Sequence, residues 1–451
     1  MLDLISLIES LSAPRKQEDY FLAKHLEQLF LSKIAKSQAT GKDGVRIGRF
    51  QESLALEAQL ISRKAFAGSY RFTNYKERLI LRGAKREPRQ ISIPTVRDRL
   101  TLRAICQVLH EHVPDTVGLS PHALVKRAVT SIKSGDQSGR SFVRIDVRNF
   151  FPSISHRLLD RELNRFLSSE MVRNLCLQAV ATPTGDESSN VRGVPQGLSI
   201  SGALSSLYMI RFDEAQVHRN PSYCRYVDDI LLICDTAKAD DELKRISRAL
   251  KSRGLIVHPK GSSGKTEIKP VSQGIDFLGY HISVEKVSVR KSSYRKMFIN
   301  LSKVITDYKY RGDWTRTLFR LNLKITGCIV DKKRRGWMMF FSYTENMAQL
   351  AHLDKFVRNR LNSVGFTEDK ISLVKRFLKS YRETRFNLSD TKYIPNFDNF
   401  DSADKVAAIT ALSGRPQEVV AAWEAASIDA EFSKLISREV HDLEQDVGSA
   451  S

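Results

Sequence analysis

Cysteine is scarce in this sequence of 451 residues. The five cysteines, at positions 106, 176, 224, 234 and 328, form no Cys-x-x-Cys pair and have no histidine at zinc-binding spacing. An odd, scattered set of this kind argues against a disulfide framework and against a structural zinc site. It is typical of proteins that work in a reducing compartment.

Long apolar runs are also absent. No stretch approaches the roughly 18 apolar residues that a membrane-spanning helix needs. The first twenty residues lack the basic segment followed by an apolar run that marks a secretory signal. We therefore expect a cytoplasmic protein with no membrane partner.

Acidic residues are outnumbered. Lys and Arg total 72 against 51 Asp and Glu, a net charge of +21. From residue 401 onward ten acids face four bases, so the positive excess lies in the preceding 400 residues. A field of this size most often attracts a phosphate backbone, although a merely basic soluble protein is the alternative.

The hydrophobic pattern predicts an α+β fold of about three domains, with 41% apolar residues to build their cores. Residues 1–65 show helical spacing, and residues beyond about 292 are mostly helical, with a polar, partly acidic annex from about 366. Between them strands and helices alternate. The predicted strands are 76–82, 90–93, 141–146 and 230–234, and the predicted helices are 96–113, 158–167, 202–212 and 240–253.

Two adjacent aspartates, Asp228 and Asp229, stand between two apolar segments. This placement predicts a β-hairpin with both carboxylates at its tip. Charged groups in an apolar hairpin are costly unless they are paired or bound to a cation. An ordinary turn, in which Asp is favoured for its hydrogen bonds to the backbone, is the alternative.

A third acid, Asp146, ends the apolar strand predicted over residues 141–146. If the strands bring Asp146, Asp228 and Asp229 to one edge of a sheet, their oxygens suit two Mg²⁺ ions, which prefer oxygen ligands. Two ions about 3.5–4 Å apart activate the attacking oxygen and stabilise the leaving oxygen of a phosphoryl displacement. We therefore predict a metal-dependent nucleotidyl-transfer site, with Mn²⁺ as the alternative ion.

Six segments resemble, in order, those of reverse transcriptases, of the type found in bacteria and in group II introns. They are Ile93-Pro-Thr-Val-Arg-Asp-Arg99, Asp146 with Phe150-Phe151-Pro-Ser-Ile154, Gly193-Val-Pro-Gln-Gly197, Tyr226-Val-Asp-Asp229, Gly254-Leu-Ile-Val-His-Pro with Lys265-Thr266, and Phe277-Leu-Gly-Tyr280. A four-residue box alone is a weak signal, whereas the ordered series is specific.

The resemblance implies a right-hand polymerase fold. Fingers and palm with an antiparallel sheet would occupy residues 66–290, and a helical thumb residues 291–365. A helical N-terminal extension (1–65) and a C-terminal annex (366–451) would flank them. The implied activity is RNA-directed DNA synthesis, with an RNA template, dNTP substrates, a DNA product and two Mg²⁺ ions.

The resemblance also implies roles for single residues. Asp146, Asp228 and Asp229 would be the catalytic metal ligands. Phe151 would exclude a 2′-hydroxyl under the incoming sugar, whereas Phe150 is expected in the core. The residues that would bind the dNTP are Arg82, Arg89 and Gln196. For Arg82, a solvated surface position is an equal alternative.

A lysine near the carboxylates would protonate the leaving pyrophosphate, which is a general-acid role. Lys265 matches the position of this lysine, but a lengthened loop before it makes Lys260 a competing candidate. Farther along, a run of cations followed by aromatic residues suits a thumb that binds a duplex through its phosphates. The predicted nucleic-acid contacts are Lys332, Lys333, Arg334, Arg335 and Trp337, with a solvated face plus core aromatics as the alternative.

Among reverse transcriptases the sequence is most similar to the defence-associated, antiphage type, which implies a dedicated non-coding RNA. No RNase H and no second acidic active site is recognisable after Tyr280. Retron-derived and intron-derived enzymes are the alternatives. Untemplated or protein-primed DNA synthesis, an RNA-binding maturase, and a protein partner or homo-oligomer stay open.

Overall fold

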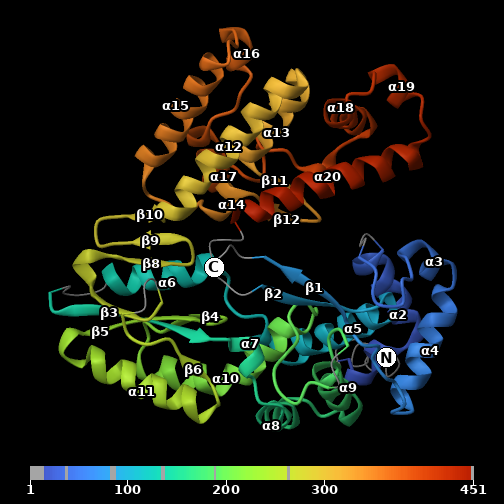
Figure 1. The fold of residues 1–451 in the computed structure, drawn as a ribbon, viewed down its shortest axis with the longest axis vertical. Helices are drawn as coiled ribbons and strands as arrows, with labels where there is room; N and C mark the ends of the chain where they lie inside the picture. Colours follow the sequence, from blue (N-terminus) through green and yellow to red (C-terminus); the bar gives the residue numbers. More distant parts are fainter. Residues whose placement is uncertain are drawn as a thin grey trace, which may run out of the picture. The chain divides into compact units, whose positions relative to one another are not determined.

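The computed structural model describes residues 15–35, 39–81, 88–133, 138–186, 189–261 and 265–447. The chain divides into two compact units, and each is described by itself. The first unit comprises residues 1–120 and 141–268, and the second comprises residues 121–140 and 269–451. Figure 1 labels the helices and strands of both units. Within the described part of the chain, no helix is both long and apolar enough to cross a membrane.

The first unit begins with short helices that pack around α5 (Val96–His112). Their apolar faces are closed by Phe21, Leu26 and Phe30, each of which is fully buried. The helical prediction for this region is therefore confirmed where the chain is described. The helices are the 3₁₀ helix η1 (Gln17–Phe21), α2 (Ala23–Leu29), the π-helix η2 (Phe30–Ile34), α3 (Ile47–Glu52) and α4 (Leu54–Phe66).

A β-hairpin precedes α5. Strands β1 (Lys76–Ile80) and β2 (Arg89–Ile93) pair antiparallel, as predicted, with Ile80 opposite Arg89. The α5 helix then begins at Thr95, whose hydroxyl accepts a hydrogen bond from the backbone of Asp98.

The central sheet has the strand order β4-β5-β3-β6, and β7 also pairs with β3. Its middle strand, β3, is buried from residue 141 to residue 147 because neighbours cover both faces. The predicted strands at 141–146 and 230–234 are confirmed. The bounds are β3 (Arg140–Arg148), β4 (Cys224–Tyr226), β5 (Asp229–Asp235), β6 (Ile256–Val257) and β7 (Glu267–Pro270).

Helices complete the core of this unit. One continuous apolar cluster joins Val143 and Ile145 of β3 to Leu207 of α10 and Ile246 of α11. The predicted helices at 158–167, 202–212 and 240–253 are confirmed with slightly different ends. These helices are α7 (Phe150–Ser153), α8 (His156–Phe166), α9 (Glu170–Ala181), α10 (Ser201–Arg219), α11 (Ala239–Ser252), and the 3₁₀ turns η3 (Pro114–Thr116) and η4 (Thr236–Lys238).

The second unit contains a three-stranded antiparallel sheet in the order β10-β9-β8. Its first hairpin turns at Leu278 and Gly279, with Phe277 opposite Tyr280. Helix α6 contacts β9, and the fully buried Tyr280 ring packs on Phe341. The elements are α6 (Pro121–Lys133), η5 (Val271–Gln273), β8 (Ile275–Phe277), β9 (Tyr280–Ile282) and β10 (Val287–Val289).

Helices form the rest of the second unit, and α20 lies along the group formed by α12, α13 and α14 (Figure 1). A single apolar core joins Leu323 and Cys328 to Val406 and Leu443, so residues on both sides of the predicted boundary at 366 pack together. The elements are α12 (Lys291–Arg311), α13 (Trp314–Thr326), β11 (Cys328–Val330), β12 (Lys333–Arg335), α14 (Trp337–Phe340), α15 (Met347–Ser363), α16 (Glu368–Ser372), α17 (Phe377–Phe386), η6 (Phe397–Asn399), α18 (Ser402–Ser413), α19 (Gln417–Ala421) and α20 (Ala425–Val447).

Candidate active site

The predicted hairpin at Asp228 and Asp229 is present. Strands β4 and β5 pair antiparallel with Tyr226 opposite Asp229, which leaves Val227 and Asp228 in the turn. The backbone N–H of Val147 donates to the Asp228 carbonyl at 3.0 Å, so the turn is held against the end of β3. The first unit thus brings Asp146, Asp228 and Asp229 to one edge of the sheet.

The turn is strained. Val227 has φ +55°, a left-handed conformation that a β-branched residue rarely adopts and that costs about 1–3 kcal/mol. Arg225 supports the turn by donating from its Nη1 to the Val227 carbonyl at 3.0 Å. Its Nε also donates to both oxygens of Asp213, at 2.8 and 3.0 Å. This support keeps Asp228 at the hairpin tip.

Asp146 is buried and lies beside a lysine and a histidine. Lys265 donates from Nζ to both of its carboxylate oxygens, at 3.0 and 2.9 Å. His258 Nε2 lies 3.2 Å from Asp146 Oδ1, and the His258 backbone N–H donates to the Asp146 carbonyl at 2.9 Å. His258 was not predicted to be a site residue. Its signal is its place directly after β6, whose Val257 pairs with Val147 beside Asp146.

Asp229 accepts hydrogen bonds from an arginine that was not predicted to be a site residue. Arg144 donates from Nε to Asp229 Oδ1 and from Nη2 to Asp229 Oδ2, each at 2.9 Å. Its Nη1 also lies 4.0 Å from a Glu267 oxygen. The strand period of two places Arg144 and Asp146 on the same face of β3, which is the signal that could have identified it.

Asp228 is the carboxylate with the fewest charged partners. Among the described residues it forms no ion pair. Burial raises its pKa to about 6, and the negative charges of Asp146 and then Asp229 add to the rise. Burial also raises the pKa of Asp229, although the hydrogen bonds from Arg144 oppose this effect. A buried carboxylate beside a second one is stabilised by any cation that binds between them.

The three carboxylates differ in how well they suit a metal ion. In the described part of the chain, no group of three or more His, Cys, Asp or Glu side chains is arranged to hold a metal ion. Asp146 and Asp228 fit such an ion, because Asp228 lacks an ion-pair partner and interacts unfavourably with Asp146. Asp229 fits less well, since both of its oxygens already accept from Arg144.

Phe150 and Phe151 follow β3 and lie edge to face, with ring centroids 5.6 Å apart. Phe150 is buried in the core, as expected, whereas Phe151 is half-buried. The Val194 backbone N–H donates to the Phe151 carbonyl at 2.9 Å, which ties the Gly193–Gly197 segment to this turn. Phe151 therefore keeps an exposed ring surface beside the end of β3.

The Gly193–Gly197 segment packs closely on neighbouring backbone. The Gln196 carbonyl accepts from Ser92 of β2 at 2.7 Å, and the Gln196 side chain is half-buried. Gly197 has φ +103°, and a Cβ at this position would lie 2.9 Å from the Ser92 carbonyl oxygen. In this structure Gly197 therefore permits close packing on β2.

The other predicted site residues of the first unit do not contact the three carboxylates where the structure describes them. Arg89 lies exposed at the start of β2, and Arg82 falls outside the described residues. Lys260 pairs with Asp240 of α11 at 2.5 Å and is half-exposed. Of the two candidate lysines, Lys265 is the one that contacts Asp146.

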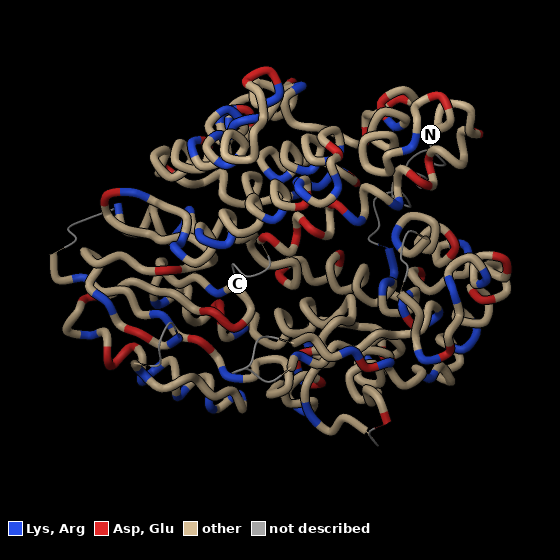
Figure 2. The backbone as a smooth tube through the Cα atoms, turned by 45° about the horizontal axis from the view of Figure 1, so that its top comes forward, with Lys and Arg blue, Asp and Glu red and all other residues tan. Residues whose placement is uncertain are grey.

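The basic run in the second unit forms a β-hairpin, not a helix. Gly327 and the turn residues Asp331 and Lys332 have positive φ, and Asp398 accepts from the backbone of both turn residues at 2.7 Å. The side chains of residues 332–334 are exposed, whereas Arg335 pairs with Glu444 of α20. Figure 2 shows basic positions distributed over both units.

Trp337 does not suit the predicted nucleic-acid contact, and this prediction is corrected. Its ring is 1% exposed and packs against Phe341 and Phe377, with centroids 4.8 and 5.7 Å away. The alternative interpretation, a core aromatic behind a solvated basic face, holds for this residue.

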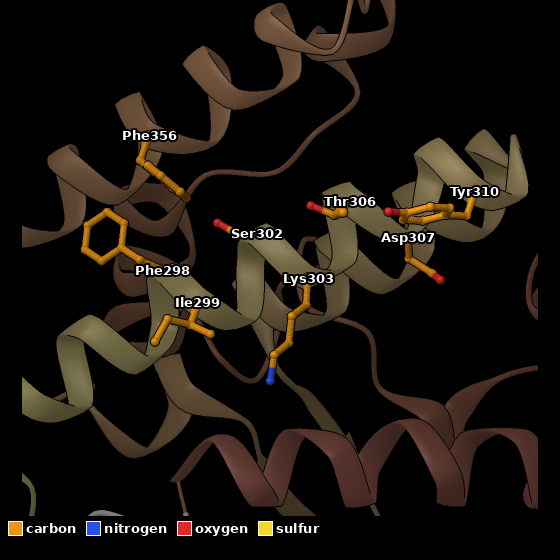
Figure 3. A pocket seen from close by; sticks show the side chains of 8 residues that line it. All are labelled: Phe298, Ile299, Ser302, Lys303, Thr306, Asp307, Tyr310 and Phe356. Carbon is orange, nitrogen blue, oxygen red and sulfur yellow. The ribbon is translucent and has the colours of Figure 1, made fainter.

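A shallow groove of about 580 Å³ runs along α12 in the second unit. Phe298 and Phe356 lie at one end, with ring centroids 4.7 Å apart, and Tyr310 lies at the other (Figure 3). Between them the groove presents the hydroxyl groups of Ser302 and Thr306. Tyr310 is 85% exposed.

Known proteins resemble the part of the chain that carries the three carboxylates. Residues 76–282 match the family model described as "Reverse transcriptase (RNA-dependent DNA polymerase)". This part of the chain is therefore similar to reverse transcriptases. The match includes the strands that carry Asp146, Asp228 and Asp229, and the α+β polymerase fold with antiparallel sheets agrees with the predicted fold class.

The other similar proteins are distant. Protein YkfC of Escherichia coli (strain K12) is 25% identical over 291 residues, which cover 54% of this chain and 75% of that protein. Apo telomerase from Candida tropicalis is 15% identical with a TM-score of 0.34, over 49% of this chain. Telomerase from Candida albicans is 14% identical with a TM-score of 0.42, over 86% of this chain and 69% of that structure. The chain spans 55% of the Candida tropicalis structure.

Proposed function

We propose that this chain is an RNA-directed DNA polymerase that joins dNTPs by nucleotidyl transfer. The observation that carries the proposal is the buried carboxylate of Asp228, which has no ion pair among the described residues and lies near Asp146. A pair of buried like charges is unfavourable by itself and becomes favourable when divalent cations bind.

Asp146 and Asp228 would hold the divalent cations. When bound, Mg²⁺ or Mn²⁺ supplies activation of the attacking oxygen and stabilisation of the leaving oxygen. Lys265 neutralises Asp146 in the structure described here, and its side chain is 42% exposed. The partly exposed ammonium group of Lys265 would be available to donate a proton to the leaving pyrophosphate.

The remaining residues would position the substrates. Phe151 presents its half-buried ring beside the end of β3, where it would lie under the incoming sugar and disfavour a 2′-hydroxyl. Arg89, whose planar fork suits phosphate oxygens, would bind the triphosphate with Gln196 nearby. The exposed bases at 332–334 would contact the phosphates of the template–primer duplex.

The proposal is tested with the double variant Asp228→Ala/Asp229→Ala. We expect loss of dNTP incorporation on a primed RNA template, while RNA binding in a filter assay is largely retained. The matched control is Asp240→Asn, which removes an exposed acid on α11. Incorporation by the double variant at the wild-type rate, in a preparation free of other polymerases, would rule out the assigned site.

We further propose that the enzyme acts in antiphage defence with a dedicated non-coding RNA. The support is the resemblance of the sequence to defence-associated reverse transcriptases. Sequencing the nucleic acid that copurifies with the wild-type protein, and with the double variant, would identify template and product together. A product that lacks any template sequence would instead favour untemplated or protein-primed synthesis.

A further inference from the structure

The contact between Arg144 and Asp229 differs from the other contacts of the carboxylate site. Both nitrogens of the arginine fork donate at 2.9 Å, one to each oxygen of the carboxylate. Paired contacts of this kind fix the rotation of the carboxylate as well as neutralising its charge. The side chains of Arg144 and Asp229 are only 9% and 13% exposed, so water cannot easily replace either partner.

Lys265 provides the contrast. It also donates to both oxygens of an aspartate, but its side chain is 42% exposed and ends in a flexible ammonium group. A cation can displace such a group into water at little cost. Displacement of Arg144 would leave a buried guanidinium without its main partner, which is strongly unfavourable. A Glu267 oxygen, 4.0 Å from Arg144 Nη1, is a more distant second ionic partner.

The fork also joins two strands. Arg144 lies on β3, two residues before Asp146, and Asp229 begins β5, the neighbouring strand in the sheet. Fixing Asp229 therefore fixes the start of β5 and with it the preceding residue, Asp228. The backbone bond from Val147 to the Asp228 carbonyl acts in the same direction.

We propose that Arg144 is a positioning residue, which keeps Asp229 as the anchor between β3 and β5 and leaves cation binding to Asp146 and Asp228. This inference rests on the proposed function, because it concerns the cations of the same site. It departs from the prediction that all three aspartates are metal ligands. Asp229 then acts on the reaction through the placement of Asp228.

The first test measures cation binding without turnover. Mn²⁺ alone is titrated into the purified full-length protein, and free Mn²⁺ is followed by electron paramagnetic resonance. We expect Asp228→Asn to weaken Mn²⁺ binding at least about tenfold more than Asp229→Asn does, because Asp228 would be a ligand whereas Asp229 acts only through the placement of Asp228. The matched control is Glu57→Gln, which alters the carboxylate of another two-nitrogen arginine fork in the same unit, that of Arg97.

The outcomes separate this inference from the proposed function. If Asp229→Asn weakens Mn²⁺ binding as much as Asp228→Asn does, Asp229 is a metal ligand and the inference is overturned, while the proposed function stands. If Asp228→Asn binds Mn²⁺ as wild type does, both fail. Loss of Mn²⁺ binding in Glu57→Gln would attribute the effects to general destabilisation and would also overturn the inference.

The second test addresses positioning by Arg144. We expect Arg144→Met to lower kcat with little change in the KM for dNTP, because the substrate contacts are intact while Asp228 is misplaced. Arg144→Lys should restore only part of the rate, since an ammonium group cannot make the two parallel contacts. Full restoration by lysine, or an unchanged kcat in Arg144→Met, would show that the fork has no positioning role.

Discussion

Successive side chains of β3 alternate between the two faces of the sheet. Val143, Ile145 and Val147 enter the core cluster of the first unit, whereas Arg144 and Asp146 lie on the face that meets the β4–β5 hairpin. The same strand therefore supplies apolar packing on one side and charged groups on the other. The geometry of the carboxylate site depends on this alternation being kept in register.

Phe151 carries the first prediction at the residue scale. Phe151→Val removes much of the half-buried ring, and with it the proposed steric barrier to a 2′-hydroxyl. We expect the preference for dNTP over NTP, measured as the ratio of kcat/KM values, to fall about 10- to 200-fold. Phe150→Leu is the control, since it alters a buried ring and should lower thermal stability without changing this ratio. An unaltered ratio in Phe151→Val would remove Phe151 from the substrate site.

At the scale of helices and strands, the parts that follow local rules were predictable. The periodic helices, such as α5 and α10, and the hairpin at Asp228 and Asp229 follow from apolar spacing, so they were confirmed. Likewise the six ordered segments located the carboxylates. Whether each carboxylate faces a metal or a cationic side chain is a tertiary property, however. Arg144 on β3 contacts Asp229 of β5, and His258 after β6 contacts Asp146 of β3, so local spacing could mark these residues but not the carboxylate that each one contacts.

The β11–β12 hairpin shows the same limit. Its basic residues were predicted on a helical thumb, because cations between apolar groups are compatible with a helix. Instead, the turn at Asp331 and Lys332 adopts positive φ and is held by Asp398, which is distant in sequence. A long-range contact of this kind overrides local propensity.

A buried ion pair joins helix α20 to α13 within the second unit. Lys324 donates to Asp446 at 2.8 Å, the two side chains are 8% and 5% exposed, and Asn300 donates to the other Asp446 oxygen. Lys324→Met leaves Asp446 buried without its cation. We expect the free energy of unfolding to fall by about 3–5 kcal/mol at pH 8 in denaturant titrations.

The sign of the pH dependence follows from Asp446. Burial raises its pKa in the folded protein, and Lys324 opposes this rise, so loss of Lys324 raises the pKa further. An acid with a raised folded pKa contributes stability that is present at low pH and is lost as pH rises through that value. The cost of Lys324→Met should therefore shrink as pH is lowered toward the ordinary Asp value. Lys434→Met, which breaks an exposed pair with Glu431, should show neither the cost nor the pH dependence.

At the scale of the whole molecule, many charged side chains pair with one another, and others stay exposed. Several acids of α20 form ion pairs with bases of the second unit. Arg320 pairs with Glu439 and Asp442, and Arg335 pairs with Glu444. These ion pairs leave the exposed bases at 332–334 as the local surplus. Basic side chains that form no ion pair within the protein are available to bind phosphates.

Salt dependence tests this surplus directly. For the triple variant Lys332→Ala/Lys333→Ala/Arg334→Ala, we expect weaker binding to an RNA–DNA duplex and a slope of log affinity against log salt that is smaller by up to about 2–3, because each phosphate contact releases close to one counterion. The control triple variant changes Lys244, Arg248 and Lys251 to alanine and removes the same charge from the exposed face of α11. Equal slopes for the two variants would mean that net charge alone governs binding. A smaller slope in the first variant only would place phosphate contacts at the β11–β12 hairpin.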